Sequence, residues 1–385
     1  MSAVPVRPRP TRPSRAHSRW PKAVVAGLSA LAVGALVSAG PAATPPAAAA
    51  TGHVYYVGPG SDADGRLERA MASLRPGDTL RIQPGTYGVD LRPDTRLSKG
   101  TASAPITITA ADPAHRPLLV GAVKFDQPTY WVIDHLRVQG TIPNRDSFTI
   151  NSGTGWRVTN TEVFGAAQTG AYANVVIAKY QGWSMPQKFV FAENCVHDGG
   201  HVDARRGQLH EIYVTAVGDS ANSLIARNTL YNTPYGAAIK LGDGGIANAP
   251  GVDNVQVSNN TMWNNGIQIL LFARTTGNKI RGNLFVKSTR TLTNGRDTTG
   301  FYLLNVVRGS SGTYPNMIEQ NYFASTTFPI FDNRSAPGVL VNRGDNNAYA
   351  GIAGITTGGC EGLQPGDAHA KYYGRYTSRS LYVAP

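Results

Sequence analysis

ARNTLYN, residues 226–232, is one of six copies of a short pattern in which an Asn precedes an apolar-rich stretch. The other copies are TNTEVF (159–164), AENCVHD (192–198), SNNTMWN (258–264), RGNLFVK (281–287) and EQNYFAS (319–325). Successive Asn residues lie 34, 34, 32, 23 and 38 positions apart, a period typical of stacked repeats whose loops differ in length. The chain is therefore expected to be a repeat protein.

Each repeat also contains a second apolar stretch. These stretches are HEIYVTA (210–216), AAIKLG (237–242), IQILLF (267–272) and FYLLNVV (301–307). They are rich in the β-branched and aromatic residues that favour strands, and no repeat has the pattern of a helix. Two or three short strands per repeat predict an all-β right-handed parallel β-helix; a β-sandwich with Asn at its turns is the alternative.

The recurring Asn has a structural explanation in such a stack. An Asn at the same turn of successive coils tolerates a left-handed backbone and can hydrogen-bond its counterparts above and below. We therefore expect Asn160, Asn194, Asn228, Asn260, Asn283 and Asn321 to form a ladder inside the stack.

The segment that begins at His53 predicts a capping element. A strand and a Gly/Asp turn lead into an amphipathic helix near residues 65–74, before the turn RPGD (75–78). Its apolar face would cover the open end of the stack, as repeat arrays require. That face consists of Leu67, Ala70, Met71 and Leu74.

The first fifty residues differ from the rest. Six basic residues precede an apolar run over 23–40, and PAAAA (46–50) ends the segment: this is the pattern of a signal peptide cleaved near Ala50. The basic residues are Arg7, Arg9, Arg12, Arg15, Arg19 and Lys22. The sequence thus predicts a signal peptide over 1–50, a β-helix domain over 51–385, secretion, and no membrane span after cleavage.

Composition limits the classes of molecule that the protein could bind. Without the predicted signal peptide, the chain has 30 Lys and Arg against 24 Asp and Glu. This mild positive charge is compatible with an acidic polymer as partner and equally with an ordinary soluble surface. No basic helix, zinc pattern or RNP-like strand indicates nucleic acid, and a monomer is expected. Cys195 and Cys360 are the only cysteines; their pairing is left open, with a free buried Cys195 favoured.

Several segments carry a family resemblance. YYVGPGSDADG (55–65), LRPGDTLRIQPGTY (74–87), LSKGTASAPITITA (97–110) and residues 209–241 resemble secreted bacterial right-handed parallel β-helix proteins of the pectin-lyase-like superfamily. The resemblance implies the fold and polysaccharide lyase activity, although the superfamily also contains glycoside hydrolases and uronate epimerases. The calcium-binding aspartate cluster of pectate lyases and the Asn-Lys-x-Glu arrangement of chondroitinase-B-like lyases are both missing.

One coil carries an insertion of about seven residues, HDGGHVDARRGQLH (197–210). Loops on a rigid scaffold commonly carry function, and this one concentrates titratable and cationic groups. Arg205 and Arg206 are candidates to clamp a uronate carboxylate through their planar guanidinium forks. A solvated polar loop without function is the alternative.

Strand alternation predicts which side chains face outward after the insertion. Ile212 and Val214 should face the core, which turns Glu211 and Tyr213 outward and places Tyr213 beside Lys240 of the next coil. For β-elimination, Tyr213 would protonate the leaving oxygen, and Lys240 or His210 would take the C5 proton. Further outward candidates for substrate binding are Glu211, Gln268 and Arg274.

Other functions use other residues. Hydrolysis would need paired carboxylates, for which Glu211, Asp203 and Asp243 are available. A uronate epimerase on the same fold is a further alternative, and so is a non-catalytic binding protein that stacks sugars on Trp183, Tyr231, Tyr235 and Trp263. No cofactor is expected; the metal ligands are unknown, with calcium as the candidate ion at the Gly-rich turns 197–200 and 242–245.

Overall fold

A computed structural model describes residues 52–92, 97–166, 171–180, 182–199, 209–215, 218–234, 236–242, 251–272, 275–286, 299–304, 316–323, 331–334, 340–343 and 347–348. Every described residue belongs to one unit of the chain, Ala48–Pro385. The predicted signal peptide lies outside the described residues. Within the described ranges, no helix is long and apolar enough to cross a membrane.

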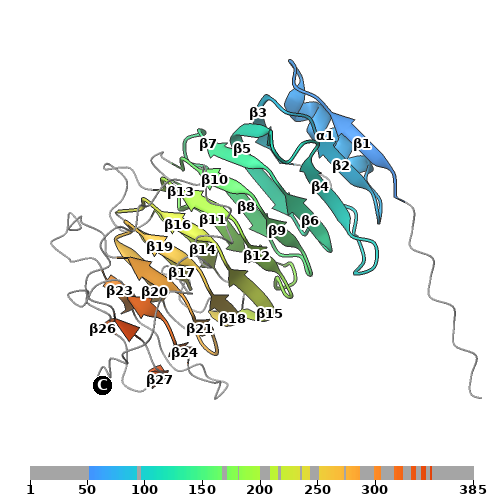
Figure 1. Cartoon of the computed structure of the whole chain (residues 1–385). Helices are drawn as coiled ribbons and strands as arrows, with labels where there is room; N and C mark the ends of the chain where they lie inside the picture. The colour runs from blue at the N-terminus through green and yellow to red at the C-terminus, as the bar shows by residue number, and fades with distance from the viewer. Residues whose placement is uncertain are drawn as a thin grey trace, which may run out of the picture. The chain divides into compact units, whose positions relative to one another are not determined.

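Parallel strands stacked coil upon coil make up almost all of the regular structure (Figure 1). An 11-stranded sheet forms the first wall of the coils. Its strands are β1 (Val54–Val57), β2 (Thr79–Ile82), β4 (Ile106–Ala110), β6 (Trp131–Asp134), β9 (Arg157–Thr159), β12 (Val190–Ala192), β15 (Gly218–Ala226), β18 (Val252–Ser258), β21 (Lys279–Arg281), β24 (Asn316–Glu319) and β27 (Leu340–Arg343).

A 17-stranded sheet forms two further walls, which join at the long strand β5 (Leu118–Asp126). The second wall contains β3 (Thr86–Leu91), β7 (Arg137–Gly140), β10 (Glu162–Phe164), β13 (Cys195–His197), β16 (Thr229–Tyr231), β19 (Thr261–Trp263), β22 (Leu284–Val286), β25 (Tyr322–Phe323) and β28 (Asn347–Ala348). The third contains β8 (Phe148–Asn151), β11 (Ala173–Ala178), β14 (His210–Thr215), β17 (Ala237–Leu241), β20 (Ile267–Phe272), β23 (Thr299–Leu304) and β26 (Phe331–Arg334). The predicted parallel β-helix is confirmed.

Columns of apolar side chains fill the interior. Ile212, Ile239 and Ile269 lie level with one another on successive coils of the third wall, and all three are fully buried. Burying each such side chain contributes roughly 1.5–3 kcal/mol, and a coil obtains this burial only against its neighbours. Stacking is therefore what stabilises each coil.

The predicted capping helix is confirmed as α1 (Ala63–Ser73). Leu67, Met71 and Leu74 join the main core, and Ala70 packs against it. The helix contacts β1 and β3, so its apolar face covers the first coil, where no earlier coil is available to stack.

The predicted asparagine ladder runs through Asn194, Asn228, Asn260, Asn283 and Asn321. In each step, Oδ1 of one Asn accepts hydrogen bonds of 2.9–3.1 Å from the backbone N and the Nδ2 of the preceding Asn. These bonds satisfy buried amides at the turn between the first and second walls.

Two details of the ladder prediction are wrong. Thr161 occupies the level expected for Asn160, since its backbone N donates to Asn194 Oδ1 at 3.0 Å. The left-handed backbone belongs to the residue before each ladder position, among them Asn160 with φ 49° and Glu193 with φ 61°. The turn thus separates the two tasks, one residue bending the chain and the next hydrogen-bonding between coils.

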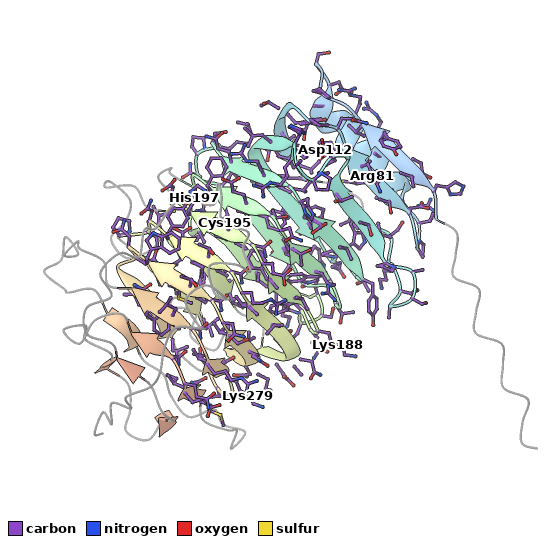
Figure 2. The ribbon with its side chains drawn as sticks, viewed as in Figure 1. Arg81, Asp112, Lys188, Cys195, His197 and Lys279 are labelled. Atoms are coloured by element: carbon purple, nitrogen blue, oxygen red, sulfur yellow. The ribbon has the colours of Figure 1, made fainter. Side chains whose placement is uncertain are left out.

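The prediction of a free thiol at Cys195 is also wrong, because Cys195 is disulfide-bonded. Its side chain packs beside Tyr231 and Trp263 outside the main core. Figure 2 shows Cys195 and His197 on the same strand, β13. Cys360 lies outside the described residues.

Candidate functional site

The outward face of the third wall brings the three predicted acid/base candidates together. Tyr213 of β14 lies level with Lys240 of β17, and Lys240 Nζ is 4.1 Å from the centroid of the Tyr213 ring. The ring of His210 contacts the Tyr213 ring edge-on, with centroids 5.6 Å apart. We call His210, Tyr213 and Lys240 the third-wall cluster.

Strand alternation explains the position of Tyr213 and Lys240. Their neighbours Ile212, Val214 and Ile239 are inside the main core, so the side chains between them must leave on the other side of the wall. Tyr213 packs there against Ala173 and Val176, outside the main core. It is only 7% exposed, whereas Lys240 is half-buried.

His210 is held in one protonation state by its surroundings. Its Nδ1 accepts a hydrogen bond of 3.0 Å from the backbone N of Ala237. Burial, assisted by the positive charge of Lys240, lowers the pKa of His210 well below its usual value. The side chain is therefore neutral near pH 7, with its acceptor nitrogen already occupied.

Tyr172 extends the cluster to the surface and was missed at the level of sequence. Its ring is 52% exposed, and the centroids of the Tyr172 and Tyr213 rings are 6.3 Å apart. The backbone N of Tyr172 donates to Asp146 Oδ1 at 2.7 Å, which fixes the chain before β11. Only the pairing of Ala173 with His210 across the coils reveals this proximity.

Glu211 does not face outward, contrary to the prediction. It is fully buried, and its carboxyl group accepts hydrogen bonds from Asn174 Nδ2 at 2.7 Å and from Gly199 N at 3.1 Å. Ala238, level with it on the next coil, belongs to the main core, so the chain enters the third wall with two successive residues turned inward. Burial raises the pKa of Glu211 to about 8, despite these hydrogen bonds.

The prediction that Gln268 faces outward is wrong for the same reason. It occupies the corresponding position of β20, is fully buried, and accepts a hydrogen bond of 3.0 Å from Asn265 Nδ2. Neither Glu211 nor Gln268 can line the outer face. The remaining predicted binding residues, Arg205, Arg206 and Arg274, lie outside the described residues, so the carboxylate clamp stays a prediction.

The inserted loop is where the sequence placed it. Residues 198–209 connect β13 to β14, whereas residues 232–236 connect the corresponding strands of the next coil, β16 and β17, which makes the first connection seven residues longer. Glu211 anchors its beginning through Gly199, where an added Cβ would lie 2.9 Å from Glu211 Oε2. Residues 200–208 lie outside the described residues.

A second outward group lies on the neighbouring wall. The rings of Phe164, His197, Tyr231 and Trp263 stack face to face on successive coils, with centroids 4.4–5.0 Å apart. Tyr231 and Trp263 are buried in this stack, which contradicts their predicted role as exposed sugar-binding rings. Their faces contact other rings of the same column.

Charged side chains enclose His197 within this stack. Glu162 Oε1 lies 3.2 Å from His197 Nε2, Asp198 Oδ2 lies 2.8 Å from His197 Nδ1, and Glu162 Oε2 accepts from Arg137 Nε at 2.6 Å. Burial opposes both ionisations, but the hydrogen bonds outweigh it: the pKa of Glu162 falls to about 2 and that of His197 rises to about 9. Arg116 Nη2 also lies 3.3 Å from Glu162 Oε2. We call Arg116, Arg137, Glu162, His197 and Asp198 the second-wall cluster.

No group of three His, Cys, Asp or Glu side chains suited to a metal ion occurs within the described part of the chain. Parts of both Gly-rich turns, residues 243–245 and residue 200, fall outside that part, so the calcium site stays a prediction.

Comparisons with known proteins bear on the fold alone, and only one of the solved structures named below has a TM-score above 0.5. No protein-family model matches the chain, and no curated protein matches its sequence. Solved structures with a similar fold include XylC in complex with xylose, at 11% identity over 76% of this chain and 68% of that chain, with a TM-score of 0.51. Pectate lyase Pel9A is 12% identical over 75% and 79% of the two chains, with a TM-score of 0.48. An alginate lyase from Paenibacillus sp. str. FPU-7 is 16% identical over 78% and 98%, with a TM-score of 0.46.

Proposed function

We propose that this protein is a lyase that cleaves a uronate-containing acidic polysaccharide by β-elimination at the third-wall cluster. The observation that carries the proposal is the contact between Tyr213 and Lys240, with Nζ 4.1 Å from the ring, beside a neutral His210. A phenol and an amine on adjacent coils about 4.8 Å apart can both reach one sugar ring.

The reaction assigns one task to each group. Lys240, after losing its own proton, takes the C5 proton, the C5–H electrons form the C4–C5 double bond, and the C4–O4 bond breaks as Tyr213 protonates O4. Lys240 rather than His210 acts as the base, because the acceptor nitrogen of His210 is occupied by the Ala237 amide. Arg205 and Arg206 are proposed to neutralise the carboxylate.

Secretion belongs to the same proposal. The basic segment and apolar run over residues 1–50 have the pattern of an export signal, and an extracellular location is where such a polymer would be met. No partner other than the polysaccharide is proposed, and the protein is expected to act as a monomer.

Hydrolysis is less well supported than elimination. Its paired-carboxylate mechanism would use Glu211, which is buried and bonded to Asn174 and Gly199. A non-catalytic carbohydrate-binding protein is the second candidate, because the exposed ring of Tyr172 can stack a sugar without any chemistry.

The test is a panel of pectate, alginate, hyaluronan and gellan, incubated with the purified protein and scanned for the ultraviolet band of unsaturated uronate. We expect one polymer to give the band and Tyr213→Phe to lose it. Tyr56→Phe, at an exposed position on β1, is the matched control and should keep the full rate. Shortened chains without the band would indicate hydrolysis, and inverted C5 by NMR without shortening would indicate epimerisation; either result overturns the lyase.

A further inference from the structure

His210 carries a buried hydrogen-bond donor that the proposed proton transfers do not use. A backbone amide can only donate, so the bond from Ala237 N to Nδ1 places the ring proton on Nε2. Nε2 is buried and has no hydrogen-bond partner, and His210 as a whole is 1% exposed. The imidazole thus presents one fixed N–H group with no acceptor.

An unpartnered donor in this position needs a reason. Leaving a buried donor unsatisfied costs about 1–3 kcal/mol, and folded proteins rarely do so. Nε2 is the ring nitrogen farther from the backbone, and the ring lies on the same side of the wall as Tyr213, with centroids 5.6 Å apart. The donor therefore belongs to the third-wall cluster.

The surroundings of His210 indicate which acceptor would suit its free N–H group. Lys240 is close enough to His210 to disfavour a second positive charge on the ring, so the ring presents a neutral N–H beside a positive charge. A carboxylate only accepts hydrogen bonds and carries the complementary charge, and bonds to charged acceptors are about twice as strong as neutral ones. A carboxylate oxygen therefore fits the His210 donor better than a hydroxyl group.

We propose that His210 donates its Nε2–H to a carboxylate oxygen of the bound uronate, so that it recognises the acid group and does not act as the base. This inference rests on the proposed function, because it assigns His210 within the same site. In an elimination, negative charge builds on the carboxylate as the enolate forms, and a fixed donor shielded from water stabilises it there. The cluster reaches the surface at Tyr172, whose ring lies beside Tyr213 and is 52% exposed.

Two substitutions separate the donor from the packing. In His210→Asn, Oδ1 replaces Nδ1 as acceptor for Ala237 N, but the distal donor is lost. In His210→Gln, the longer amide can return an N–H group to the distal position. His135→Asn is the matched control, since His135 lies at a turn with φ 53°, a conformation that Asn tolerates.

The experiment measures binding by calorimetry, which needs no turnover. Oligogalacturonate, oligomannuronate and hyaluronan fragments are each compared as the free acid and as the methyl ester. We expect His210→Asn to weaken acid binding by about 10-fold or more and ester binding by less than about 2-fold. His210→Gln should recover most of the loss, and 15N NMR of the wild type should show the proton on Nε2.

The outcomes separate this inference from the lyase proposal. The inference about His210 is overturned if the wild type does not prefer any acid over its ester, if His210→Asn weakens binding of the acid and of the ester equally, or if NMR places the proton on Nδ1. A wild type that prefers the acid through His210 but forms no unsaturated product supports the inference and refutes the lyase. If the wild type cleaves the polymer but His210→Asn still prefers the acid over the ester, the lyase proposal is supported and the inference about His210 is refuted.

Discussion

His197 and His210 lie on consecutive strands of one coil, both largely buried, and yet their pKa values shift in opposite directions. Burial alone lowers the pKa of a histidine, and His210, with a backbone amide on Nδ1 and Lys240 nearby, follows that rule. At His197, hydrogen bonds to Asp198 and Glu162 outweigh burial. The hydrogen-bond partners of each histidine, and not its depth of burial, therefore decide whether it is charged.

The same difference separates the two clusters. In the second-wall cluster both nitrogens of His197 face carboxylates, and Glu162 is bonded to His197 and Arg137. In the third-wall cluster His210 keeps one donor without an acceptor, next to the ammonium of Lys240. A cluster with its bonds complete stabilises the stack, whereas one that lacks an acceptor is suited to bind a ligand.

Replacing the lysine of the third-wall cluster should have the largest effect. We expect Lys240→Met to lower kcat/KM on the best polymer by about 100-fold or more, because general acid–base groups typically contribute that much. Lys124→Met is the matched control: Lys124 faces outward in the same column of the third wall but pairs with Asp126 at 2.8 Å. Initial rates at the unsaturated-product band measure both variants, and equal losses would show that the site is misplaced.

Glu162→Gln should damage stability and spare activity. It leaves Arg137, Arg116 and His197 without the carboxylate that they share, and breaking a buried ion pair typically costs about 3 kcal/mol or more. Glu193→Gln is the control, since the Glu193–Arg227 pair is partly exposed and should be worth no more than about 1 kcal/mol. Urea unfolding measures the free energies. A loss of activity in folded Glu162→Gln would contradict the separation of the two clusters.

The pH dependence of stability should have opposite signs at the two histidines. The folded pKa of His197 is raised from 6.5 to about 9, so its contribution is complete below pH 6.5 and is lost as pH rises towards 9. The folded pKa of His210 is lowered, so its contribution is complete above pH 6.5 and is lost as pH falls.

Unfolding free energies of His197→Asn and His210→Asn between pH 5 and 9.5 test both signs. The deficit of His197→Asn relative to wild type should shrink by about 1–3 kcal/mol from pH 6 to 9.5. Relative to His210→Asn, the wild type should lose at most about 2 kcal/mol more between pH 7.5 and 5. Parallel curves for the two variants would mean that the charge assignments are wrong.

The repeat made much of the fold predictable from the sequence. The strand over 267–272 was predicted with its observed bounds, and alternation paired Tyr213 with Lys240, because a side-chain period of two leaves few choices once the core residues are known. The Asn spacing likewise predicted a hydrogen-bonded ladder. These features depend on local pattern and register alone.

Features that depend on how the chain bends were not predictable in this way. Alternation placed Glu211 and Gln268 outside, whereas the bend at the entry to the third wall turns both inside. The sequence predicts that Tyr231 and Trp263 are exposed, but rings on adjacent coils bury one another by stacking. The proximity of Tyr172 to Tyr213 follows from pairing between coils, which no single segment encodes.

The smallest expected effect is at Tyr172, which would extend the open third-wall cluster to the solvent. Its ring is 52% exposed beside Tyr213, so Tyr172→Ala should remove a stacking surface for one sugar and raise KM by about 3- to 10-fold with little change in kcat. Tyr180→Ala is the control, since Tyr180 follows the other end of β11 beside Trp183 and is 58% exposed. If kcat falls and KM does not rise, the Tyr172 ring acts in the chemical step, and Tyr172 must be counted among the catalytic residues of the cluster.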